Sequence, residues 1–168
     1  ALNHNMTPCD YLGNELVEYK EYGGWTPQNY DNSSSNDTLI SLWYSLANSL
    51  NLPTMDLYFK TGYALLTKES KPVLESIADL MIKEDNLYFT IQGHVCCTQN
   101  SRDAVNRKTN QRNLSLARAK FIYDYLIKKG ISKRRMKYVG MRRKFPLGGA
   151  PEFDRRVEIL INYVGEKR

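Results

Sequence analysis

The chain has 168 residues, of which 42% are hydrophobic and 25% charged, an ordinary composition for a soluble folded domain with its own core. No apolar run approaches the ~18 residues of a membrane-spanning helix, which excludes that class of segment. The net charge of +6 is uneven, because residues 1–52 hold six acidic and one basic side chain and residues 53–168 carry +11. Such a basic body favours an anionic partner: nucleic acid, an anionic membrane or an acidic polymer such as cell wall.

Residues 1–52 are predicted to form an irregular, aromatic and acidic extension. The stretch "YGGWTPQNYDNSSSND" is rich in Gly, Pro, Asn and Ser, which are typical of turns. Near its end, Leu39, Leu42, Leu46 and Leu50 recur at helical spacing. We therefore expect a short helix there, packed on the rest of the chain.

Residues 53–168 are predicted to form one α/β (α+β) domain. Apolar alternation indicates strands, and apolar residues three and four apart indicate helices. The expected order is a strand at 55–59, a helix from Thr67 or Ser70, a strand at 86–95, a helix at 114–130, and strands at 135–141 and 155–164. This β-α-β-α-β-β order predicts a sandwich: a four-stranded mixed sheet with both main helices on one face.

The three cysteines leave at least one thiol without a partner in the chain. We predict a disulfide from Cys9 to Cys96 or Cys97, which would tie the extension to the domain; the alternative is three reduced thiols. His94 lies beside Cys96, but adjacent cysteines rarely supply two ligands to one zinc ion. We therefore expect no metal, no other cofactor and no catalysis, with His94 bonded to nearby backbone. The basic clusters lack the aromatic platform of RNA-binding domains, so nucleic acid is not expected as a partner.

Three short motifs point in one direction when taken together. "GHVC" at 93–96 ends the second predicted strand, "LSLARA" at 114–119 opens the second main helix, and "RRVE" at 155–158 begins the last strand. From about Asp56 to Tyr163 the chain resembles the C-terminal peptidoglycan-binding domain of the OmpA, Pal and MotB family. The family has Gly-His-Thr-Asp, Asn-x-x-Leu-Ser-x-x-Arg-Ala and Arg-Arg-Val-Glu at the corresponding places.

The resemblance implies a ligand and a set of site residues. The family binds diaminopimelate in the stem peptide of Gram-negative peptidoglycan, a residue that ends in a carboxylate and an ammonium. Arg118, in the first turns of a helix, would hold the carboxylate through its planar fork and the helix dipole. A surface salt bridge from Arg118 to Asp124 or Asp154 is the alternative. The other residues placed at the site are Phe59, which would wall the pocket, and His94, Asp103, Asn110, Asn113, Arg155 and Arg156.

The chain departs from the family pattern at the acid. Cys96 stands where the family has the Asp that receives the ammonium, and Lys60 stands where relatives often have an acid. The segment from Gly93 to Arg118 is longer than the family motif, and Asp103 is the only acid between His94 and Arg118. Asp103 would then receive the ammonium, or it would simply pair with a neighbouring arginine of the loop.

These features predict a non-catalytic periplasmic module that anchors to peptidoglycan at the cell wall or outer membrane. The alternative is a structural subunit that uses the same fold to dock into an outer-membrane complex, with a degenerate peptidoglycan site. The aromatic, acidic extension favours docking, whereas Arg118 and the basic domain favour anchoring.

Overall fold

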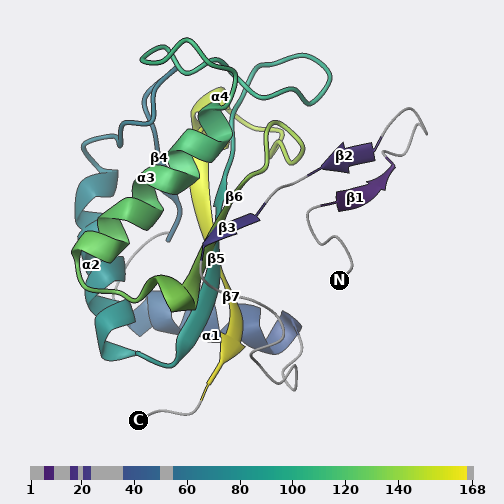
Figure 1. Ribbon diagram of the computed structural model, residues 1–168. Coiled ribbons are helices and arrows are strands. Elements are labelled where there is room, and N and C mark those ends of the chain that lie inside the picture. The colour runs from purple at the N-terminus through teal and green to yellow at the C-terminus, as the bar shows by residue number, and fades with distance from the viewer. Residues whose placement is uncertain (1–5, 10–15, 19–20, 24–35, 50–54, 166–168) are drawn as a thin grey trace.

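The computed structural model describes residues 6–9, 16–18, 21–23, 36–49 and 55–165 (Figure 1). A five-stranded sheet in the order β3-β6-β5-β7-β4 forms its centre. The main elements are β3 (Glu21–Gly23), α1 (Asn36–Ser49), β4 (Leu57–Tyr58), α2 (Ser70–Lys83), β5 (Leu87–Gly93), α3 (Leu114–Lys128), β6 (Met136–Gly140) and β7 (Arg156–Val164). The smaller ones are β1 (Met6–Cys9), β2 (Leu16–Glu18), η2 (Lys133–Arg135) and α4 (Pro151–Asp154).

The four strands after residue 53 confirm the predicted order and the mixed sheet. β5 pairs parallel with β6 and antiparallel with β7, and β4 pairs antiparallel with β7. The parallel pair requires a crossover, which α3 supplies. In Figure 1, α2 and α3 lie on the same side of this sheet, as the sequence predicts. No helix in the described ranges is both long and apolar enough to cross a membrane.

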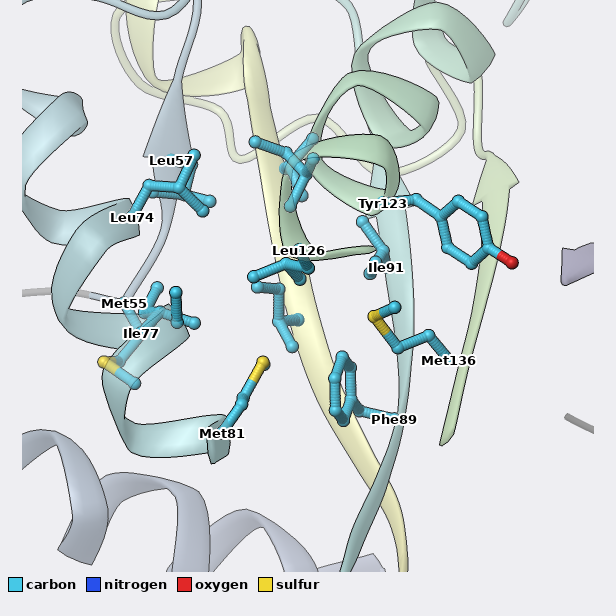
Figure 2. Close-up of a cluster of buried hydrophobic side chains, with 14 of the residues drawn as sticks. Met55, Leu57, Leu74, Ile77, Met81, Phe89, Ile91, Tyr123, Leu126 and Met136 are labelled. Carbon is cyan, nitrogen blue, oxygen red and sulfur yellow. The ribbon is translucent and has the colours of Figure 1, made fainter. Parts of the chain in front are cut away.

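The core lies between the two main helices and the sheet. Figure 2 shows Ile77 and Met81 of α2 and Leu126 of α3 directed toward Phe89 and Ile91 of β5. Each of these side chains is at most 1% exposed. Burying a side chain of this size contributes roughly 1.5–3 kcal/mol, so this layer fixes the helices on the sheet.

The buried face of α3 differs from the face that its apolar residues predict. Apolar spacing predicts that Phe121 is buried, but Phe121 is 36% exposed, whereas Arg118 and Ala119 are fully buried. The buried face is therefore rotated relative to the one that the apolar residues alone indicate. In α2, Ile82 also belongs to the apolar face that its spacing predicts, yet it is 50% exposed.

The extension is more regular than predicted. β1 and β2 pair with each other, and β3 adds an edge strand to the main sheet by pairing antiparallel with β6. The ring of Tyr22 on β3 stacks on Tyr138 of β6 at a centroid distance of 5.2 Å. This contact covers the open edge of β6, which explains why a Gly-rich segment forms a strand. The predicted helix is confirmed as α1, whose Leu42 and Leu46 pack against the core.

Candidate functional site

The candidate site is built on the first turn of α3, which rests directly on the sheet. Gly93 and Gly140 are paired across β5 and β6 beneath this turn. A Cβ atom on Gly93 would overlap the carbonyl oxygen of Ser115, and one on Gly140 would lie 2.6 Å from Ser115 Oγ. The two glycines therefore allow α3 to start in contact with the strand ends, which brings Arg118 to the end of β5.

Asp103 holds the N-terminus of α3. Its Oδ1 accepts hydrogen bonds from the backbone N–H groups of Ala104 and Ser115, both at 2.8 Å, and its Oδ2 accepts one from Ser115 Oγ at 2.7 Å. The N-cap residue itself, Asn113, makes no side-chain cap hydrogen bond. Burial raises the pKa of Asp103, and the hydrogen bonds from Ser115 and Ala104 oppose that shift. The loop thus supplies a cap from twelve residues upstream of Ser115.

Arg118 lies one turn into α3 and is fully buried, with 0% of its surface exposed. Its Nε donates to the carbonyl oxygen of Tyr63 at 3.1 Å, Nη1 to that of His94 at 3.0 Å, and Nη2 to that of Lys60 at 3.1 Å. Its guanidinium also lies 5.5 Å from the centroid of the Phe59 ring. Arg118 therefore ties the 60–63 loop, the end of β5 and α3 together.

The surroundings of this buried cation are short of negative charge. Within the described ranges, no acidic side chain forms an ion pair with Arg118. Burial, and after it the nearby charge of Arg155, lower the pKa of Arg118 to about 10, and the charge of Asp103 only partly opposes both effects. Arg155 is half-buried, and its Nη1 donates to the Sγ atom of Cys96 at 3.1 Å. Sulfur is a weak acceptor, so two guanidinium groups face a site that lacks a strong anionic partner.

A second buried arginine shows what a purely structural arrangement looks like. Arg135 also donates to three carbonyl groups, those of Met81, Glu84 and Leu87. The carbonyls of Met81 and Glu84 belong to the last turn and the C-cap of α2, the negative end of a helix dipole, and Leu87 begins β5. Burial lowers the pKa of Arg135, but the charge of Asp85 raises it. Arg135 is therefore electrostatically compensated by its own chain, in contrast to Arg118.

Of the predicted site residues, Phe59 and Arg155 lie next to Arg118, through the Phe59 ring and the charge of Arg155. The alternative salt bridges are wrong, because Asp124 pairs with Lys120 at 2.7 Å and Asp154 lies 4.0 Å from Arg156.

The predicted asparagines contact the loop and not Arg118. Asn110 is exposed and has a φ of 61°, and its N–H donates to the carbonyl oxygen of Asn106. Asn113 donates to the side chain of Gln111, and its Oδ1 is buried without a hydrogen-bond partner in the described part of the chain. Both therefore help to shape the loop before α3, and a direct role in binding stays a prediction.

His94 and Arg156 place their side chains on the other face of the sheet. His94 contributes only its carbonyl oxygen to Arg118. Arg156 bonds to Glu158 at 2.6 Å and to the carbonyl oxygen of Phe145 at 3.2 Å. The expected bond from the His94 ring to backbone is not formed, since neither ring nitrogen has a hydrogen-bond partner among the described residues. The strand alternation at the ends of β5 and β7 separates these side chains from Arg118.

The sulfur atoms of the adjacent residues Cys96 and Cys97 lie against each other. A disulfide from Cys9 to one of these two cysteines stays a prediction. In the described part of the chain, no cluster of His, Cys, Asp and Glu side chains could hold a metal ion.

The long loop between β5 and α3 forms a basic rim beside this site. The Asn106 and Gln111 backbones bridge the loop, and the N–H of Arg107 donates to the carbonyl oxygen of Gly62 at 2.9 Å. This bond fastens the loop to the 60–63 segment that contacts Arg118. The exposed basic side chains of the loop are Arg102, Arg107, Lys108 and Arg112.

Several members of the site have no recognisable signal in the sequence. Lys60 and Tyr63 contribute backbone carbonyl oxygens, which any residue could supply. The capping role of Asp103 depends on how the loop folds back, and no local capping pattern indicates it.

Several solved structures share this fold. The peptidoglycan-associated lipoprotein from Burkholderia pseudomallei is similar at 19% identity and a TM-score of 0.55, over 69% of this chain and 98% of that one. The cell wall anchor of the T6SS from Pseudomonas aeruginosa is similar at 21% identity and a TM-score of 0.52, over 79% of this chain and 100% of that one. The periplasmic domain of Helicobacter pylori MotB matches at 17% identity and a TM-score of 0.51, over 63% of this chain and 69% of that one.

At these identities the solved structures establish the fold alone. A comparison with curated proteins finds no match. The sequence profile of the OmpA family matches residues 58–156, which include both arginines of the candidate site. Because this match spans more than half of the chain, the protein belongs to the OmpA family.

Proposed function

We propose that this protein is a non-catalytic module of the cell envelope that anchors to peptidoglycan by binding a carboxylate of the diaminopimelate-containing stem peptide. Its place would be the periplasm, at the cell wall or outer membrane. Family membership supports the proposal, as do similar folds described as a peptidoglycan-associated lipoprotein and as a cell wall anchor. The basic rim beside the site would attract an acidic polymer.

The observation that carries the proposal is the only partly compensated charge of Arg118. A buried cation without an ion pair is costly unless something neutralises it. Arg135 has the negative end of a helix and Asp85 to do so, whereas at Arg118 the charge of Arg155 outweighs that of Asp103. A ligand carboxylate between Arg118 and Arg155 would supply the missing anion and would displace the weak sulfur contact of Arg155.

The site favours the carboxylate of diaminopimelate over its ammonium. Cys96 replaces the family acid that receives the ammonium. Asp103 is the acid whose charge acts on Arg118, but both of its oxygens already accept hydrogen bonds from the start of α3. We therefore assign the main recognition to the arginines and a secondary contact with the ammonium to Asp103.

Binding requires the mouth of the site to open, because Arg118 has no exposed surface. Lys60 is exposed and Arg155 is half-buried, so an incoming carboxylate would meet these two cations first. Arg118 would then exchange its bonds to the carbonyl groups of Lys60 and Tyr63 for a bidentate contact. The bonds that Arg118 would give up join its charge to neutral carbonyl groups, whereas the new contact brings an opposite charge to the buried guanidinium; charge-assisted bonds contribute about 1.5–3 kcal/mol.

Co-sedimentation with purified sacculi tests the proposal. Arg118→Met should weaken binding roughly tenfold to a hundredfold, the equivalent of one charge-assisted bidentate contact. Arg135→Met is the matched control, because it removes a buried guanidinium with the same number of carbonyl bonds. It should lower the melting temperature but leave sacculus binding of the folded protein unchanged.

Arg155→Gln gives a milder second variant in case Arg118→Met does not fold. Arg155 is half-buried and its side chain bonds to sulfur, so its loss should weaken binding with little change in stability. If both Arg155→Gln and a folded Arg118 variant bind sacculi as strongly as the wild type, the assignment of carboxylate binding to Arg118 and Arg155 is refuted. The docking alternative would then be favoured, since a fully buried Arg118 is also what a degenerate site would show.

A further inference from the structure

A pocket of about 500 Å³ opens on the face of the sheet that α2 and α3 do not cover. It lies between the ends of β5 and β7 and the loop that follows β6. Its polar lining comes mainly from the strands and its apolar lining from the loop. The lining residues are Gln92, His94, Met141, Lys144, Phe145, Pro146, Leu147, Arg156 and Glu158.

The floor of this pocket is set by strand register. Gln92 lies opposite Glu158 in the β5–β7 pair, and the N–H of His94 donates to the carbonyl oxygen of Arg156 at 2.8 Å. Because alternate residues share a face, these four side chains project to the same side. Arg156 then bonds to Glu158 and to the carbonyl oxygen of Phe145, which fixes the loop above the floor.

His94 is the unusual member of the floor. It is 2% exposed, and neither ring nitrogen has a hydrogen-bond partner within the described ranges. The nearest acid is Glu158, whose Oε1 is 3.7 Å from Nε2, beyond hydrogen-bonding distance but close enough for the two groups to influence each other's pKa. Burial lowers the pKa of His94 and Glu158 only partly opposes that shift, so the ring is neutral near pH 7 and offers one donor and one acceptor. Buried polar atoms normally have partners, and these two lack them.

The charges and the walls indicate a neutral ligand. The positive charges of Lys144 and Arg156 are balanced by the negative charges of Glu158 and the adjoining Asp154. The pocket therefore favours neither an anionic nor a cationic ligand. Gln92 and His94 both donate and accept hydrogen bonds, and Glu158 accepts them. Phe145 and Leu147 are 49% and 55% exposed and give the pocket an apolar wall. A sugar ring matches this lining, because it combines hydroxyl groups at its edge with an apolar C–H face.

We propose that this pocket is a saccharide-binding site, in which His94 and Gln92 bond to sugar hydroxyl or amide groups and Phe145 packs on the ring. The site is independent of the carboxylate site, because it uses the opposite face of the sheet. His94 belongs to both, through its ring here and through its carbonyl oxygen at Arg118. The end of β5 therefore separates two binding surfaces.

Nitrogen-15 NMR of the full chain tests this site directly. The probes are triacetylchitotriose and maltotriose, neither of which contains a peptide or a charge. The sequence has only two histidines, so the imidazole signals of His94 can be resolved from those of His4. Saturable shifts of the His94 ring nitrogens on adding either sugar are expected, and the preferred probe identifies an acetylated or a plain sugar.

Matched phenylalanine variants distinguish the pocket from the general surface. Phe145→Ala should weaken sugar binding roughly twofold to tenfold, the range for loss of one aromatic contact. Phe153→Ala, at 48% exposure and outside the pocket, should leave it unchanged. Absence of any His94 ring shift at saturating sugar, or equal binding by the Phe145 variant and the wild type, would overturn the assignment. Sacculus binding through Arg118 could persist in either case.

Discussion

Replacing Asp103 with alanine should destabilise the protein through the N-terminus of α3. The change removes an acceptor for two backbone N–H groups and one hydroxyl, at 2.7–2.8 Å. Loss of an N-cap costs about 0.5–2 kcal/mol, and hydrogen bonds to a charged group are worth about 1.5–3 kcal/mol. Asp103 is half-buried, so water replaces part of the loss. We expect a decrease of about 2–3 kcal/mol in the free energy of unfolding, measured by urea denaturation.

A double-mutant cycle identifies the partner. Ser115→Ala removes the hydroxyl that bonds to Asp103 Oδ2, so the two substitutions should be non-additive by roughly 0.5–2 kcal/mol. Asp79→Ala, an exposed acid on α2, is the control and should change stability by less than about 0.5 kcal/mol. A loss for Asp103→Ala no larger than that of the control, or full additivity with Ser115→Ala, would show that the carboxylate does not cap α3.

Two further predictions concern the strands that frame the site. Gly93→Ala should lower the free energy of unfolding by about 1–3 kcal/mol or more, because the new Cβ meets the Ser115 backbone. If chemical denaturation shows that the variant is as stable as the wild type, the close approach of α3 is contradicted. Glu158 has its pKa lowered from 4.5 to about 2 by His94 and Arg156. The ionised Glu158 therefore contributes on the order of 2 kcal/mol to the free energy of unfolding. This contribution is present above pH 4.5 and is lost as the pH falls through the folded pKa of Glu158. Glu158→Gln should flatten this acid limb of the stability curve, and an unchanged slope would contradict the ion pair.

The order of elements could be predicted from the sequence because each has strong periodicity. The strand at β5 and the helix at α3 both lie within two residues of the predicted bounds. The orientation of α3 could not be predicted, because the close contact at Gly93 and Gly140 rotates its buried face. β3 could not be predicted either, because a short strand at a sheet edge depends on its partner, β6, more than on its own residues.

The candidate site was predictable only in part. Arg118 and Phe59 follow from the motif and lie 5.5 Å apart, guanidinium to ring centroid. His94 and Arg156 belong to the GHVC and RRVE motifs, but their side chains point to the other face of the sheet. Membership in a motif does not specify on which side of a strand a residue lies.

The central claim is that Arg118 recognises a carboxylate, and a pair of modified ligands tests it most directly. Isothermal titration of the wild-type protein would compare three soluble stem peptides. They carry diaminopimelate with both side-chain groups free, with the side-chain carboxylate amidated, or with the side-chain amine acetylated. Amidation should weaken binding roughly tenfold or more, as expected for loss of a charge-assisted bidentate contact. Acetylation should have a smaller effect, since Cys96 replaces the acid. Strong loss on acetylation with none on amidation would contradict the account.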